Sequence, residues 1–123
     1  MTNSTAPHYK DLEIVENQYS HREYNINISI PEFNCTCPRT GLPDFANIDI
    51  NYIPHKWIVE LKSLKLYIVK YRNIGIFHEH VTNQIMDHFK KACEPNKIQV
   101  IGNFHPRGGI KTSISAEWQK NKN

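Results

Sequence analysis

The sequence predicts one α+β domain in which two β-hairpins flank a pair of helices. Apolar and polar residues alternate in four stretches, at residues 24–30, 45–52, 98–104 and 110–118, and this alternation is the period of half-buried strands. Between the second and third stretches, apolar residues recur at the spacing of amphipathic helices. The order ββααββ therefore predicts an antiparallel four-stranded sheet with two helices on one face.

Length and composition agree with one globular domain. The chain has 123 residues, of which 39% are hydrophobic and 22% are charged, and single domains run to about 100–200 residues. No apolar run approaches the ~20 residues that span a bilayer, and residues 1–7 lack the apolar stretch of a signal peptide. We therefore expect a cytoplasmic protein with no membrane partner. The expected organisation is a polar N-terminal arm over residues 1–20, a single domain over residues 21–119 and a polar tail over residues 120–123.

The first hairpin surrounds a loop that contains cysteines. Pro31 marks either the end of the first strand or an edge position, and Pro54 closes the second strand. Residues 35–44 hold two prolines and a glycine, which disfavour regular structure. The two strands are therefore expected to pair in antiparallel fashion on either side of this loop.

The two helices follow the first hairpin. The first is expected over residues 63–73, with Ser63 as its N-cap and Gly75 as a stop signal. The second is expected over residues 78–93 and ends before Pro95. The apolar stripe of this second helix consists of Val81, Ile85, Phe89 and Ala92.

The second hairpin completes the expected sheet. Its strands are joined at residues 105–109, where two glycines are free to adopt positive φ. A four-stranded sheet leaves two edge strands, and such edges must be covered or paired. Because edges that pair around a ring close a barrel, the topology also favours a homo-oligomer.

Charge and cysteine content restrict the function classes. The 15 Lys and Arg exceed the 12 Asp and Glu by a net charge of +3, which is too small to indicate duplex binding but allows a local site for a phosphorylated ligand. A small RNA-binding module is an alternative because lysines occur in pairs, although aromatic residues are not interleaved with basic ones. The odd count of 3 cysteines argues against a disulfide framework.

Cys37 is a candidate nucleophile. It precedes a proline in an irregular loop, where its sulfur can be exposed and Arg39 can stabilise a thiolate. Asp44, at the start of the next strand, can return close to Cys37 and donate a proton. The alternative is that Cys37 is a buried apolar residue and Asp44 a turn residue, and spacing alone does not decide between the two.

The second helix opens on a segment that contains two histidines. Glu79 can complement the helix dipole there, and His78 can be a cap or a surface residue. The zinc-type ligands in the loop and in this segment are Cys35, Cys37, His78 and His80. Neither Cys-x-Cys nor His-x-His matches a common structural zinc spacing, so we expect no metal site.

Two short segments are candidates for phosphate binding. Lys62 and Lys65 point to one side of the first helical turn, beside backbone N–H groups that are free at a helix start. Residues 107–109, Arg-Gly-Gly, form a second candidate cradle. A solvated charged face is the alternative for both. The sequence contains no Gly-x-Gly-x-x-Gly, so a dinucleotide would not bind in the Rossmann manner.

Together, four segments resemble the motifs of one enzyme family. Residues 60–67, Glu-Leu-Lys-Ser-Leu-Lys-Leu-Tyr, resemble the signature of the NADPH-dependent nitrile reductases of queuosine biosynthesis, the 7-cyano-7-deazaguanine reductases. Residues 37–45 look like their catalytic loop, residues 77–79 like their base-binding element and residues 104–109 like their late cofactor turn. The resemblance covers residues 28–115, and the chain length is that of the short, single-module branch.

The resemblance implies the tunnelling fold, which has the order ββααββ and is shared with GTP cyclohydrolase. Subunits of that fold pair edge to edge into a barrel, with active sites at the subunit interfaces. For the short branch the implied assembly is a decamer of two pentamers. A zinc-dependent pterin hydrolase of the same fold is the alternative, and stoichiometric zinc in the active protein would favour it.

The resemblance also implies a covalent mechanism that needs no metal and no nucleic acid. Cys37 attacks the nitrile carbon of 7-cyano-7-deazaguanine to give a thioimide, Asp44 protonates the nitrogen, and two NADPH molecules supply the hydrides that give 7-aminomethyl-7-deazaguanine. The implied substrate-binding residues are Val59, Glu60, Leu61, Phe77, His78 and Glu79. The implied cofactor-binding residues, which hold the NADPH phosphates, are Lys62, Lys65, Arg107 and Gly108.

Overall fold

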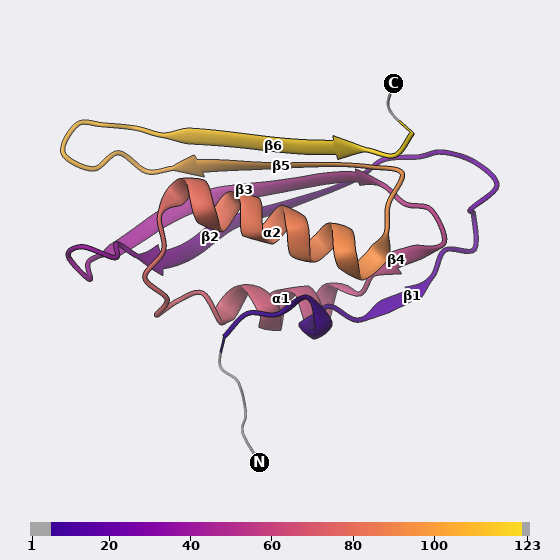
Figure 1. Cartoon of the computed structure of the whole chain (residues 1–123), viewed down its shortest axis with the longest axis horizontal. Helices are drawn as coiled ribbons and strands as arrows, with labels where there is room; N and C mark the ends of the chain where they lie inside the picture. Colours follow the sequence, from indigo (N-terminus) through magenta and orange to yellow (C-terminus); the bar gives the residue numbers. More distant parts are fainter. Residues whose placement is uncertain (1–5, 122–123) are drawn as a thin grey trace, which may run out of the picture.

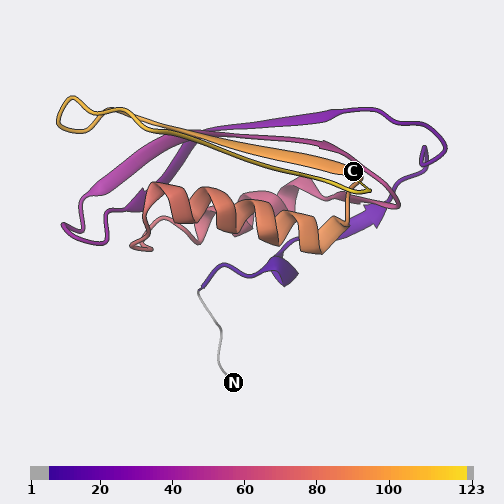
Figure 2. The same cartoon turned by 45° about the horizontal axis from the view of Figure 1, so that its top comes forward.

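The computed structural model describes residues 6–121 and shows a four-stranded antiparallel sheet with both helices on one side (Figures 1 and 2). In chain order the elements are the 3-10 helix η1 (Tyr9–Asp11), β1 (Ile14–Glu16), β2 (Ile26–Thr36), β3 (Pro43–Ile53), β4 (Trp57–Val59), α1 (Leu61–Val69), α2 (His78–Cys93), β5 (Lys97–Phe104) and β6 (Ser113–Gln119). The sheet order β2-β3-β5-β6 confirms the α+β class and both predicted hairpins. Residues 1–5 of the predicted arm and residues 122–123 of the predicted tail lie outside the described residues.

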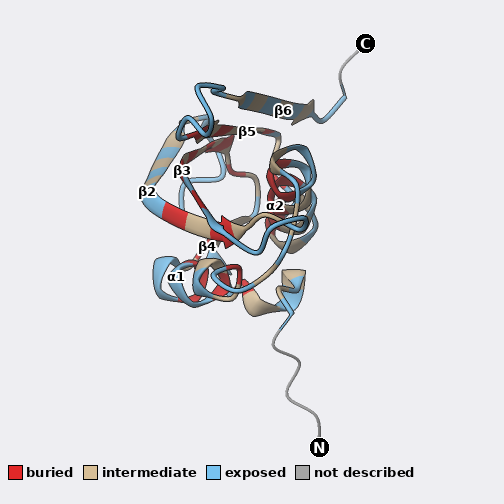
Figure 3. Ribbon diagram, turned by 90° about the vertical axis from the view of Figure 1, so that its left-hand side faces the viewer, coloured by how far each residue is buried: buried red, intermediate tan, exposed pale blue. Residues whose placement is uncertain are grey.

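The core lies between the sheet and the helices, where the buried residues gather (Figure 3). The strand residues that alternate onto this inner face include Ile48, Ile50, Tyr52, Ile98 and Val100, and all of them are buried. Helix α2 faces them with the predicted stripe of Val81, Ile85 and Phe89. Ala92, the fourth predicted position of the stripe, also packs against the core but is only partly buried, and the sequence did not predict that the buried Cys93 continues the stripe.

Strand β2 does not end at Pro31, so of the two predicted alternatives the edge position is confirmed and the strand end is not. β2 is an edge strand, where a residue without an N–H can be accommodated on the unpaired side. The pairing with β3 shifts register between Ile30 and Phe33, which marks a bulge, and then resumes. Cys35 therefore pairs with Asp44, and the irregular loop is shorter than the sequence indicated.

Helix α1 begins at Leu61 rather than at Ser63, because the N-cap is Glu60. The Glu60 carboxylate accepts hydrogen bonds from the backbone N–H groups of Lys62 and Ser63, both at 2.8 Å. Ser63 lies inside the first turn, where its hydroxyl donates to the Glu60 carbonyl at 2.7 Å. The helix also ends earlier than predicted, at Val69, after which the backbone bonds tighten to an i→i+3 pattern.

The described part of the N-terminal arm contains two short elements that the sequence did not predict, η1 and β1. The strand β4, which follows β3, was not predicted either. β1 pairs with β4 in a two-stranded sheet, and each strand has only three residues, too few to display an alternating pattern. The buried Leu12 and an ion pair of 2.9 Å between Asp11 and Lys70 hold this segment against the rest of the protein. Among the described residues, no helix is both long and apolar enough to cross a membrane.

At Gly102, β5 lies close against α2. A Cβ at this position would lie 2.6 Å from Thr82 Oγ1 and 3.0 Å from Phe104 Cε1. We predict that Gly102→Ala lowers the free energy of unfolding by about 1–3 kcal/mol because the helix must move away. Urea denaturation measures the difference. The matched control is Ser115→Ala at an exposed position of β6, for which we expect a change within about 0.5 kcal/mol. Equal midpoints for both variants would contradict the steric argument.

Candidate active site

The loop between β2 and β3 presents Cys37 at one end of the sheet. The Cys37 N–H donates to the Leu42 carbonyl and the Gly41 N–H donates to the Cys37 carbonyl, both at 2.8 Å. These bonds close a tight turn immediately beyond the last residue pair of the hairpin. Cys37 is half-buried in this turn, whereas Cys35, two residues earlier, is fully buried.

The turn lowers the pKa of the Cys37 thiol. The largest cause is a hydrogen bond from the Thr40 side chain, followed by the backbone N–H groups of Thr40 and Arg39. Each of these donors stabilises the thiolate. Arg39 lowers the pKa of Cys37 through its backbone N–H, whereas the sequence suggested a role for its side chain.

The other two cysteines have the opposite environment. Burial raises the pKa of Cys35 to about 12, and burial likewise raises the pKa of Cys93 to about 12. Both thiols therefore stay protonated at neutral pH and pack as small apolar groups. The interpretation as a buried apolar residue fits these two cysteines, and the interpretation as a nucleophile fits Cys37.

Asp44 is a buried carboxylate held between two basic side chains. Only 5% of the residue is exposed. Its Oδ1 accepts a hydrogen bond of 2.8 Å from Arg107 Nη1, and its Oδ2 lies 3.2 Å from His78 Nε2. Arg107 Nη1 also donates to the Pro43 carbonyl. Asp44 is therefore an anchored acid at the base of the site and not merely a turn residue.

Helix α2 begins beside the cysteine loop because the preceding segment pairs with the end of β2. Thr36 donates to the Ile74 carbonyl at 2.9 Å and accepts from the Ile76 N–H at 3.0 Å. This parallel bridge brings Gly75 against the loop, where a Cβ would lie 3.3 Å from the Pro38 Cα. The sequence indicated only a stop signal at Gly75, yet the glycine also permits this close approach.

These segments enclose a cavity of about 280 Å³, which is near the lower end of the usual 300–1,000 Å³ for small-ligand sites. Its walls come from the cysteine loop, the start of α2 and the β5–β6 hairpin, and they consist of Cys37, Pro38, Thr40, Asp44, Ile76, Phe77, His78, Glu79 and Arg107. Six residues predicted to act in catalysis, substrate binding or cofactor binding thus meet in one place: Cys37, Asp44, Phe77, His78, Glu79 and Arg107. Gly108 follows Arg107 in the predicted tight turn, with φ of 59°.

The other five predicted residues do not line this cavity. Val59, Glu60, Leu61, Lys62 and Lys65 lie at or near the start of α1. That helix start is at the opposite end of the molecule from the β2–β3 loop (Figure 1).

The structure also corrects the predicted phosphate cradle at the start of α1. The backbone N–H groups expected to be free at the helix start are bound by Glu60, and these bonds lower the pKa of its carboxyl group. The side chains of Lys62 and Lys65 are exposed at this end.

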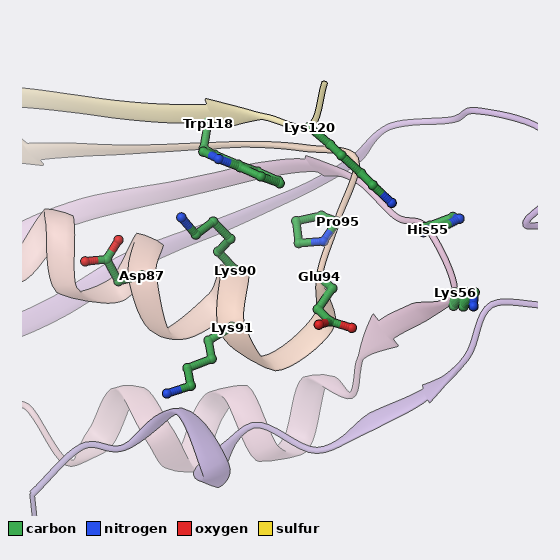
Figure 4. A pocket seen from close by; sticks show the side chains of 9 residues that line it. All are labelled: His55, Lys56, Asp87, Lys90, Lys91, Glu94, Pro95, Trp118 and Lys120. Atoms are coloured by element: carbon green, nitrogen blue, oxygen red, sulfur yellow. The ribbon is translucent and has the colours of Figure 1, made fainter. Parts of the chain in front are cut away.

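A larger cavity of about 790 Å³ lies at the C-terminal end of α2 (Figure 4). Four lysines line it, and Lys90 Nζ lies 4.9 Å from the centroid of the Trp118 ring. It contains no cysteine and no residue predicted to act in catalysis. The residues predicted to act in catalysis therefore line the smaller cavity and not the larger one. Within residues 6–121, no three or more His, Cys, Asp or Glu side chains are grouped so that they could hold a metal ion.

Sequence reasoning missed two neighbours of His78. Thr112 Oγ1 lies 2.6 Å from His78 Nδ1. The Phe104 ring stacks on the imidazole, with centroids 3.8 Å apart and planes inclined by 6°. The only signal for Thr112 was a polar residue on an otherwise apolar strand face, which is common and not specific.

We predict that iodoacetamide at neutral pH alkylates Cys37 much faster than Cys35 or Cys93, because the thiolate is the reacting form. Mass spectrometry of peptides from the folded protein measures the three rates. Thr40→Val removes the largest stabilising hydrogen bond of the Cys37 thiolate, so it raises the pKa of Cys37 and slows alkylation at neutral pH. Thr40→Ser keeps the hydroxyl and serves as the control. Alkylation of Cys35 at a rate comparable to Cys37 would contradict the assignment.

Comparisons with known proteins identify the relatives of this chain. Residues 43–123 match the family model described as QueF-like protein. A reductase of Nitrosomonas eutropha is 53% identical over 90% of this chain and 80% of its own length. Reductases of Thermomicrobium roseum and Chloroherpeton thalassium are each 50% identical over 90% of this chain, and the matches cover 87% and 96% of their lengths. All three are named NADPH-dependent 7-cyano-7-deazaguanine reductase.

A solved structure shares the fold. The archaeosine synthase QueF-Like in the apo form superposes with a TM-score of 0.71, and the match covers 76% of this chain and 91% of that one at 20% sequence identity. The family match spans more than half of this chain, and the identity to three curated relatives is 50% or more. The resemblance inferred from the motifs is thus confirmed, and the chain belongs to the QueF-like family.

Proposed function

We propose that this protein reduces the nitrile of 7-cyano-7-deazaguanine to the aminomethyl group of 7-aminomethyl-7-deazaguanine with NADPH, in the cytoplasm, for queuosine biosynthesis. The observation that carries the proposal is a thiol of lowered pKa that shares one cavity with a buried carboxylate, a histidine and a glutamate. A nitrile is a poor hydride acceptor until a nucleophile has added to its carbon, so a reactive thiolate is the group that this reduction needs.

The first chemical step is addition of Cys37 to the nitrile. A bond forms between its sulfur and the nitrile carbon, one π bond of the nitrile breaks, and the nitrogen takes up a proton. In the proposed step Asp44 takes the proton that the Cys37 thiol gives up and transfers it to the nitrogen. Each of two hydrides from two NADPH molecules is then accompanied by one proton, and the carbon–sulfur bond breaks after the first transfer. The products are the amine, the free thiol and two NADP⁺.

The mouth of the cavity suits a flat heterocycle. The Phe77 ring is 41% exposed there and is available to stack on the base. Glu79 lines the same cavity, and its carboxylate can accept hydrogen bonds from the guanine-like N–H edge. His78 contacts the substrate at the base of the cavity in this proposal.

We further propose that a second copy of the chain completes each site. The start of α1, which carries Lys62 and Lys65, is remote from Cys37 within one chain (Figure 1). β2 and β6 are the two edges of the four-stranded sheet, and edge-to-edge pairing of copies satisfies both edges. The proposed assembly is the barrel of the tunnelling fold, as a decamer of two pentamers. The likeness to the solved QueF-Like structure supports the subunit fold alone.

Arg107 can serve the acid and the cofactor together. Its Nη1 is occupied by Asp44 and Pro43, but a guanidinium has five N–H donors. Its side chain is 41% exposed, so the remaining donors can bind an NADPH phosphate beside Gly108 while Asp44 stays paired. In this proposal Lys62 and Lys65 of a neighbouring copy hold the other phosphates.

We predict that the wild-type protein consumes NADPH only when 7-cyano-7-deazaguanine is present and forms a covalent adduct with it even without NADPH. Intact-protein and peptide mass spectrometry locate the adduct, which we expect on Cys37. Cys37→Ala should abolish both adduct and turnover, whereas the matched variant Cys35→Ala should retain both. An adduct mapped to Cys35 would overturn the mechanism, and a wild type inert toward the nitrile would overturn the function.

We predict that Lys62→Ala raises the KM for NADPH roughly 10- to 100-fold, because one charge-assisted contact contributes about 1.5–3 kcal/mol. Adduct formation without NADPH should stay unchanged, since Lys62 is proposed to act on the cofactor alone. The control is Lys56→Ala, which removes an exposed lysine from the larger cavity. Steady-state kinetics with NADPH and NADH provide the readout. Equal use of NADH by the wild type would contradict the proposed contact to the 2′-phosphate, the group that NADH lacks.

A further inference from the structure

The ring of His78 is held on three sides. Its Nε2 lies 3.2 Å from Asp44 Oδ2, its Nδ1 lies 2.6 Å from Thr112 Oγ1, and Phe104 covers one ring face at 3.8 Å. Thr112 immediately precedes β6 and is tied to β5 by its carbonyl, which accepts the Phe104 N–H at 3.0 Å. The stacked ring and this backbone bond fix where the Thr112 hydroxyl meets the imidazole.

The two polar contacts of the ring, a hydrogen bond with Thr112 and a 3.2 Å contact of Nε2 with the Asp44 carboxylate, determine each other. A neutral imidazole carries a proton on one nitrogen only. An ionised carboxylate attracts an N–H and repels a nitrogen lone pair, so the proton is favoured on the Nε2 that faces Asp44. Nδ1 is then bare and must accept a hydrogen bond, and the neighbouring Thr112 hydroxyl is able to donate one. In the opposite tautomer, the lone pair of Nε2 would face a lone pair of Asp44.

We propose that Thr112 is a positioning residue that holds neutral His78 in the tautomer with its proton on Nε2, and so keeps Asp44 oriented for proton transfer. The consequence for the reaction rests on the proposed nitrile reduction, whereas the tautomer itself does not. Thr112 touches neither Cys37 nor the substrate in this proposal, and it acts through His78. The β5–β6 hairpin therefore acts on Asp44 in two ways: Arg107 contacts Asp44 directly, and Thr112 holds its other partner, His78.

Thr112→Val and Thr112→Ser test the proposal, because valine matches the shape of threonine without a hydroxyl and serine keeps the hydroxyl. Single-turnover adduct formation measures the chemical step, and calorimetry measures substrate binding. We expect Thr112→Val to slow adduct formation about tenfold, since the loss of one hydrogen bond of typical strength corresponds to such a factor. We expect the substrate dissociation constant to stay within about twofold of wild type and Thr112→Ser to restore the rate.

The tautomer is observed directly and without substrate. Solid-state ¹⁵N NMR of protein labelled at histidine distinguishes a protonated from a bare ring nitrogen, and the difference spectrum against His78→Gln assigns the signals of His78. We expect a single Nε2–H form in wild type and Thr112→Ser, and a second tautomer in Thr112→Val. If Thr112→Val does not fold, Thr112→Ala takes its place in both measurements, because alanine removes the hydroxyl without adding an apolar branch.

Three outcomes would overturn the proposal. They are a wild-type ring protonated on Nδ1 and bare at Nε2, an unchanged tautomer and rate in the variants without a hydroxyl, and a loss in Thr112→Ser as large as in Thr112→Val. A wild type that forms no adduct would instead contradict the proposed function, and the NMR measurement would still decide the tautomer.

Discussion

The candidate site depends on the pairing of one buried carboxylate, that of Asp44. A buried charge without a partner is strongly unfavourable, and removal of one member of a buried pair typically costs about 3–5 kcal/mol. The partners of Asp44 come from two segments far along the chain: His78 opens α2, and Arg107 lies in the β5–β6 hairpin. Folding must bring both onto the start of β3, and the same closure forms the cavity around Cys37. The carboxylate that stabilises this end of the fold is thus also the group proposed to carry the proton beside Cys37.

The two neighbouring cysteines differ in pKa because the backbone changes from strand to turn between them. Cys35 is still in the strand, and its side chain is directed into the core, where burial raises the pKa to about 12. Cys37 follows the last paired residue and lies in a turn that directs N–H groups toward its sulfur. Two residues of chain therefore separate a thiol of raised pKa from one of lowered pKa. A strand that ended at Pro31, one of the two alternatives that the sequence allowed, would have left Cys35 in the loop as well.

Hydrophobic periodicity and the stop signals of proline and glycine were sufficient to predict the large elements. They failed where a single side chain or a distant partner decides the bounds of an element or the make-up of the site. The bounds of α2 were predicted correctly because its apolar stripe is long and Pro95 follows it. Glu60 was missed as a cap because a glutamate before a helix rarely differs in pattern from any other surface charge. β1 and β4 pair with each other across a long stretch of sequence, so neither is visible in its own three residues. The six residues that meet in the cavity were identified by motif resemblance, whereas Thr112 has no motif and becomes visible only through its distance to His78.

The separation of the predicted residues into two groups has a physical consequence for the assembly. One group surrounds Cys37, and the other lies at the start of α1, near the opposite end of the sheet (Figure 1). Within one chain, the residues at the start of α1 do not line the cavity around Cys37. A neighbouring copy placed edge to edge can supply these residues to the Cys37 site of another copy. If both groups act in one reaction, each copy contributes to two sites. Because Val59, Glu60 and Leu61 belong to the second group, substrate binding and reduction would then both depend on the oligomer.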